Sequence, residues 1–193
     1  MKKNNFLSKL IPLSLGIILL FHQSLFSNPN ELNIGFGSCL DQDMSFEIFE
    51  KVIDQNPNYF IFMGDNIYLD SENPEEKIPA YKKFTENKKF LKLKKNTKLF
   101  FTWDDHDFGV NDAGNDYKEI EKSKEIFLKY IEEPNDSPRR KRKGVYDSYM
   151  VNFASKKIQI ILLDTRTFRS PIKSRFWGFG SYIPNTDPGA SFF

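Results

Sequence analysis

Cysteine and histidine are scarce in this chain of 193 residues, which contains one cysteine and two histidines. A single cysteine excludes an internal disulfide framework and a four-cysteine zinc site. The longest mostly apolar run has 12 residues, fewer than the about 20 residues that a membrane-spanning helix needs. The formal net charge of +2 is too close to zero to indicate a nucleic-acid-binding protein by itself.

The residues that are abundant suit a globular protein. Hydrophobic residues make up 39% of the chain and charged residues 28%, as in soluble domains. Twenty phenylalanines supply ample material for a hydrophobic core. The length corresponds to about one domain.

Residues 1–27 predict an export signal. Two lysines near the start precede the apolar run Leu10–Phe21, and Ser24 and Ser27 lie near a plausible cleavage point. We therefore expect a protein of the periplasm or the extracellular space; an uncleaved leader would instead anchor it to a membrane. Removing the leader also removes three lysines and changes the net charge from +2 to −1.

The remaining chain alternates two kinds of hydrophobic pattern. Short apolar runs predict strands, and apolar residues at helical spacing predict helices. Such alternation predicts an α/β fold whose sheet includes parallel pairs. The expected strands are 33–37, 59–63, 98–103, 145–153 and 158–164, and the expected helices are 46–53, 75–95 (a surface helix) and 120–131.

Polar side chains follow four of these strands, where α/β sheets bind ligands. After the second strand, Gly64 permits a tight exit, and Asp65 has two oxygens that can bridge two cations. Tyr68 can turn its oxygen toward the same ion, and a phenolate suits a ferric ion. The alternative interpretation is a turn aspartate beside a core tyrosine. The strand at 158–163 ends in Asp164, Thr165 and Arg166.

Three carboxylates surround His106 after the third strand, at Asp104, Asp105 and Asp107. Neighbouring like charges repel, so a bound cation would stabilise the cluster. His106 could donate a proton to a phosphate or leaving group. A solvated acidic loop is the alternative.

Cys39 follows the first strand and is the one thiol. It is either a thiolate metal ligand or a buried, inert cysteine.

One dense basic run spans 139–143, after Pro138. It predicts a solvated loop, or a surface for a phosphate-rich partner or an anionic membrane. No aromatic residues are interleaved to stack on bases, so we expect no nucleic-acid partner.

Together these segments resemble the alkaline phosphatase D (PhoD-like) family of calcineurin-like metallophosphatases. The resemblance runs through most of residues 33–188. The matching segments are GSC at 37–39, FMGDNIY at 62–68, TWDDHDFG at 102–109, LLDTRTFR at 162–169 and YIPN at 182–185.

The resemblance implies a centre of two cations, Fe³⁺ and Ca²⁺. Cys39, Asp65 and Tyr68 correspond to iron ligands, with Asp65 as the bridge. Asp105 corresponds to a ligand of the second cation, and Asp104 is a ligand or lies next to one.

The resemblance also implies a phosphate ester substrate, with His106 as the catalytic residue that contacts the phosphoryl group. Residues 28–193 would form the N-terminal half of a four-layer α-β-β-α sandwich, because family members carry further metal ligands in a C-terminal part. We therefore expect a truncated form that binds metals weakly and is nearly inactive alone. The alternatives are a non-catalytic exported remnant or binding module, and a surface-binding protein that uses the run at 139–143. The sequence does not separate monoester from diester substrates.

Overall fold

The computed structural model describes residues 31–174 and 182–192, and the predicted export signal lies outside them. Strands and helices alternate through the first two thirds of the described chain, as the sequence pattern predicts. The elements are β1 (Ile34–Gly37), α1 (Glu47–Asp54), β2 (Tyr59–Phe62), η1 (Pro74–Lys77), α2 (Ile78–Thr85), α3 (Lys88–Asn96), β3 (Lys98–Phe101), α4 (Asp105–Phe108), α5 (Ile120–Tyr130), η2 (Pro138–Arg140), β4 (Asp147–Phe153), β5 (Lys156–Leu162), β6 (Lys173–Ser174) and β7 (Tyr182–Ile183).

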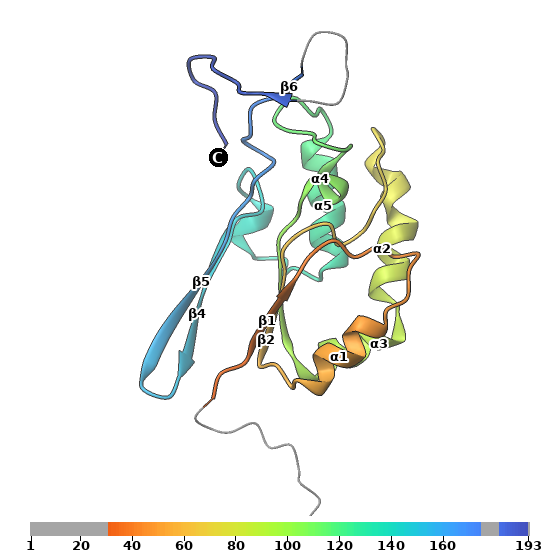
Figure 1. Ribbon diagram of the computed structural model, residues 1–193, viewed down its shortest axis with the longest axis vertical. Coiled ribbons are helices and arrows are strands. Elements are labelled where there is room, and N and C mark those ends of the chain that lie inside the picture. The colour runs from red at the N-terminus through yellow and green to blue at the C-terminus, as the bar shows by residue number, and fades with distance from the viewer. Residues whose placement is uncertain (1–30, 175–181, 193) are drawn as a thin grey trace, which may run out of the picture.

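The first three strands form a parallel sheet in the order β1-β2-β3. Gly37 lies opposite Phe62, which lies opposite Phe101, so the strands end level with one another. The carboxyl ends of all three strands therefore meet at one edge. β4 and β5 form a separate antiparallel hairpin, and Figure 1 shows this hairpin on one side of the parallel sheet and the helices on the other. These elements confirm the predicted α/β class.

Each face of the parallel sheet buries its own cluster of hydrophobic residues. Phe60 and Phe62 point to the larger cluster, which includes buried residues of α1, α2, α3 and α5. Tyr59 and Ile61 alternate with them and pack against a smaller cluster that includes Val151 of the hairpin. Alternate side chains of a strand point to opposite faces, so the Tyr59–Phe62 run is fully apolar because both faces are covered.

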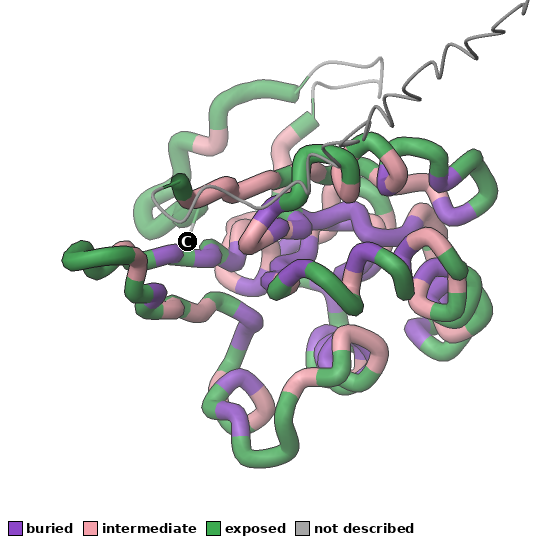
Figure 2. Tube along the Cα trace, turned by 90° about the horizontal axis from the view of Figure 1, so that it is seen from below, coloured by how far each residue is buried: buried purple, intermediate pink, exposed green. Residues whose placement is uncertain are grey.

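Burial is concentrated in the middle of the molecule, and the loops around it are exposed (Figure 2). Apolar side chains are also exposed in the hairpin and directly after it, where Ile161 is 62% and Leu163 51% exposed. In the described ranges no helix is long and apolar enough to cross a membrane.

The predicted surface helix over 75–95 is wrong in two respects. The segment is divided into η1, α2 and α3, and Asn87 begins α3 by accepting a hydrogen bond from the Lys89 amide at 2.9 Å. Asparagine is a strong helix N-cap, so it starts a new helix rather than continuing the old one. Lys77, at the end of η1, is only 1% exposed, although the spacing placed it on a surface helix.

Candidate functional site

Three chain segments that leave the parallel sheet converge at one edge. Cys39 follows β1, Asp65 follows β2, and α4 with Asp105 and His106 follows β3. Asp65, Asp105 and His106 each offer a ligand atom, and these atoms lie within 4.8 Å of one another. The two aspartates are buried, while His106 is partly exposed. The arrangement thus combines buried carboxylates with an imidazole that solvent can reach.

Asp65 is the residue around which the other predicted ligands gather. Its Oδ2 lies 3.6 Å from the Cys39 sulfur and 3.1 Å from the Tyr68 hydroxyl, which donates to it. Its Oδ1 is buried and has no hydrogen-bond partner in the described part of the chain. Both Cys39 and Asp65 have left-handed backbone conformations, with φ of 61° and 51°. Such conformations are uncommon for residues other than glycine and often occur at functional sites.

The alternative of a buried, inert Cys39 is wrong, because this thiol is exposed.

The charges around Asp65 disfavour its ionised form in the absence of a cation. Burial raises the pKa of Asp65, and the carboxylates of Asp105 and Asp104 raise it further. Burial also raises the pKa of Tyr68, with the neighbouring Cys39 and Asp65 adding to the effect. Tyr68 therefore donates to Asp65 as a neutral phenol. A positive charge placed here would oppose each of these effects.

Arg166 neutralises the first two aspartates after β3. Its guanidinium forms ion pairs with Asp104 and, at 3.4 Å, with Asp105. Burial favours the neutral form of Asp105, but the hydrogen bond from the Asp112 amide at 2.7 Å and the charge of Arg166 outweigh it, so the pKa is lowered overall. Asp105 is therefore an ionised carboxylate, and both it and Asp104 are paired with Arg166.

His106 is oriented by a residue that the sequence analysis missed. Its Nδ1 lies 2.8 Å from Asp70 Oδ1. A carboxylate accepts, so Nδ1 donates the proton, and Nε2 remains available to a ligand. The Tyr68 ring also lies 4.3 Å from the imidazole, measured between centroids. Asp70 follows Tyr68 by two residues, and only its position at the end of this polar segment could have suggested it.

Asp107 has a structural role, so the alternative of a solvated acidic loop is wrong. It is 1% exposed and accepts hydrogen bonds from the Asn66 and Asp104 amides and from the Tyr81 hydroxyl. Burial raises the pKa of Asp107 to about 7, against the opposing hydrogen bonds from Asn66 and Asp104. These bonds tie the exit of β2 to the start of α4, which fixes the distance between Asp65 and Asp105.

Of the polar residues that follow β5, Arg166 belongs to the candidate site and Asp164 has a structural role. Arg166 reaches the aspartates, as described above. Asp164 is 3% exposed and accepts from the amides of Val145, Arg166 and Thr167. Asp164 therefore shapes the turn that delivers Arg166 to the site.

The donor set suits a metal ion. The unpartnered, buried Asp65 Oδ1 and the raised pKa of this carboxyl both indicate a position where a cation would be favourable. Carboxylates, a phenol and an imidazole are ligands of iron, manganese or zinc, and carboxylates suit calcium. The residues present therefore fit a metal centre, and the donors alone leave open which metal binds.

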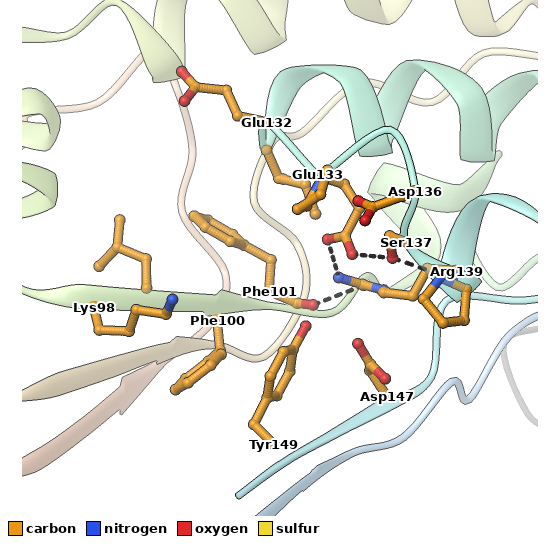
Figure 3. A pocket seen from close by; sticks show the side chains of 14 residues that line it. Lys98, Phe100, Phe101, Glu132, Glu133, Asp136, Ser137, Arg139, Asp147 and Tyr149 are labelled. Atoms are coloured by element: carbon orange, nitrogen blue, oxygen red, sulfur yellow. Dashed lines mark hydrogen bonds and ion pairs between the residues drawn. The ribbon is translucent and has the colours of Figure 1, made fainter. Parts of the chain in front are cut away.

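The basic run at 139–143 lies elsewhere, and only part of it is exposed, at Lys141 and Lys143. Arg139 is 1% exposed, and Figure 3 shows its guanidinium directed toward Glu133 and the Phe101 carbonyl, at 2.9 Å from each. Arg142 pairs with Asp147 at 3.2 Å. The prediction of a solvated loop is wrong for Arg139, because the Glu133 carboxylate and the carbonyls of Val145 and Phe101 replace water around it.

Comparisons with known proteins support one relationship at the level of fold. No family model matches the sequence, and no curated protein matches it. A solved structure of PhoD is similar, with a TM-score of 0.53 and 15% sequence identity. The match covers 75% of this chain and 34% of the PhoD chain, so this chain spans about a third of that protein's length. The described residues therefore have a PhoD-like α/β fold.

Proposed function

We propose that this chain carries the metal site of an exported, metal-dependent phosphoester hydrolase of the alkaline phosphatase D type. The observation that carries the proposal is the cluster of Asp65, Asp105 and His106 ligand atoms within 4.8 Å at the carboxyl ends of β2 and β3. The PhoD-like fold supports it. Because the chain spans about a third of PhoD, the hydrolytic activity and the four-layer α-β-β-α architecture belong to the proposal.

The proposed metals are Fe³⁺ and Ca²⁺. Cys39, Asp65 and Tyr68 would hold the first and Asp105 the second, with Asp65 between them and Asp104 close by. When bound, such cations offset charge on the phosphoryl oxygens and provide a nucleophile from water near neutral pH.

The chain's own residues would then position and protonate the substrate. His106 holds its Nδ1 proton against Asp70. When Nε2 is also protonated, its N–H can donate to a phosphoryl oxygen or transfer that proton to the leaving group. Arg166 holds Asp104 and Asp105 in place through ion pairs with both carboxylates. Asp107 holds the two strand exits at a fixed separation.

Hydrolysis of p-nitrophenyl phosphate and of bis(p-nitrophenyl) phosphate tests this function and separates monoester from diester specificity. With iron and calcium supplied, we expect slow turnover that exceeds the rate of the chelator-treated chain, consistent with the low activity expected from the sequence. His106→Ala should lower kcat by about 10²- to 10⁴-fold, the usual contribution of a general acid or base. The matched control is Asp116→Asn, at an exposed aspartate outside the cluster.

Turnover that is independent of metal, or that His106→Ala leaves unchanged, would refute the proposal. Cation binding without any turnover would instead favour a non-catalytic binding module that keeps this site.

A further inference from the structure

Lys77 is a buried cation that no predicted role accounts for. It lies at the junction of η1 and α2 and is 1% exposed. Its ammonium donates to three backbone carbonyls, those of His106 at 2.7 Å, Gly109 at 2.6 Å and Leu69. Within the described ranges no carboxylate oxygen lies within 4 Å of its nitrogen. Three donors thus match three carbonyls, which is the full capacity of an ammonium group.

The three carbonyls belong to the two segments that build the candidate site. Leu69 lies between Tyr68 and Asp70, in the segment that follows β2. His106 and Gly109 lie within and at the end of α4, which follows β3. One ammonium therefore joins the backbone beside Asp70 to the backbone of the histidine that Asp70 contacts.

Burial lowers the pKa of Lys77 to about 8, against the opposing charges of Asp107, Asp70 and Asp105. The side chain is therefore mainly charged at neutral pH, and its hydrogen bonds to the carbonyls are charge-assisted. Bonds of this kind are about twice as strong as those between neutral groups. Few side chains other than lysine offer three donors from one atom in so small a space.

We propose that Lys77 is a positioning residue, whose ammonium fixes the Tyr68–Asp70 segment against α4 so that His106 keeps Nδ1 on Asp70 and leaves Nε2 for the substrate. The effect on catalysis rests on the proposed function. The effect on the His106 proton does not, because it follows from the contacts alone.

Lys124 provides a matched control. It is also buried, at 6% exposed, and donates to the Arg142 carbonyl at 2.9 Å while pairing with Glu121. It joins α5 to the loop after η2 and contacts neither segment of the site. If Lys77 served only general stability, Lys77→Met and Lys124→Met would therefore have the same effect on the proton of the His106 ring.

The first test is the protonation of the His106 ring, measured by ¹⁵N NMR in the full chain. The one other histidine, His22, is assigned with a His22→Gln variant. In the parent and in Lys124→Met, we expect the proton on Nδ1. In Lys77→Met we expect loss of that preference, with the Nε2-protonated form appearing. A folded Lys77→Met chain with the parent's proton position would overturn the proposal.

The second test is kinetic. Lys77→Met should lower kcat by about 100-fold, since a displacement of about 1 Å near the chemistry costs about that factor, and should change KM little. If the parent protein shows no phosphoester turnover, the proposed function fails while the NMR experiment still decides the role of Lys77.

Lys77→Gln covers the case in which Lys77→Met does not fold, because its amide keeps two donors. We expect a folded chain with a partial shift of the His106 proton. A folded Lys77→Gln chain with an unchanged ring would overturn the proposal. Failure of both Lys77 variants to fold while Lys124→Met folds would also overturn it, since Lys77 would then be required for the fold rather than for the site.

Discussion

Replacement of Arg139 by methionine tests the most deeply buried ion pair of the described chain. The guanidinium bonds to Glu133 at 2.9 Å, to the Val145 carbonyl at 2.8 Å and to the Phe101 carbonyl at 2.9 Å. The Glu133 side chain is itself only 10% exposed. Arg139→Met would remove the cation that pairs with this carboxylate, leaving it the Ser137 hydroxyl as donor, and would remove a donor from each of the two carbonyls.

The expected cost follows from the buried charge that remains. Removing one partner of a buried ion pair typically costs about 3 to 5 kcal/mol. Small domains are stable by only about 5 to 15 kcal/mol, so the variant loses a large fraction of its stability. Urea unfolding followed by circular dichroism measures the change.

Two further variants isolate the cause. Lys141→Met removes an exposed cation from the same basic run and should change stability by no more than about 0.5 kcal/mol. Arg139→Met combined with Glu133→Leu should recover part of the loss, because the second change removes the unpaired carboxylate. A cost below about 1 kcal/mol for Arg139→Met, or equal to that of Lys141→Met, would refute the assignment of Arg139 to the core.

Two other perturbations test the scaffold of the site. The pKa of Asp107 is about 7 in the fold against an ordinary 3.8, so its contribution to stability is complete below about pH 4 and is lost as the pH rises toward 7. Urea unfolding across this range should show a decline in stability that Asp107→Asn lacks. Parallel pH dependences of the two proteins would contradict this. Gly64 has a φ of +110°, and a Cβ added there would lie 2.7 Å from Asp104 Cβ, whereas Gly189 has a φ of +85° and no atom within 4 Å of such a Cβ. Gly64→Ala should therefore lower Tm more than Gly189→Ala. Equal losses of Tm would show that the close approach to Asp104 costs nothing.

The fold was predictable where local pattern and tertiary burial agree. The run over 59–63 reads as a strand because the helices cover one of its faces and the hairpin packs against the other. The helix over 120–131 has apolar residues at helical spacing because one of its faces packs in the core. The break at Asn87 was missed, although its capping preference is a local signal.

The candidate site was predictable in its residue types but less in their roles. Asp65, Tyr68, Asp105 and His106 were identifiable because each follows a strand. Asp107 was grouped with them, yet its partners come from Asn66 and Tyr81, which lie far away along the chain. Its burial and structural role depend on contacts that residue spacing cannot supply.

Buried cations were the main failure of sequence reasoning. Lysine and arginine are almost never fully buried unless they are paired, so Lys77 and Arg139 were placed at the surface. Both are buried because backbone carbonyls surround them, and those of Gly109 and Phe101 lie 32 and 38 residues away along the chain. Only the three-dimensional arrangement brings those carbonyls together.

Cation binding at Asp65 shows directly whether the carboxyl ends of β1, β2 and β3 form a metal site. Metal analysis of the purified chain, followed by calorimetric titration of iron and calcium into chelator-treated protein, gives affinity and stoichiometry. We predict binding in the parent and in Asp116→Asn, and its loss in Asp65→Asn. Bound cation should also stabilise the fold by about 2.7 kcal/mol at a free concentration 100 times Kd. Failure of the parent to bind either cation, or equal binding by Asp65→Asn, would contradict the account.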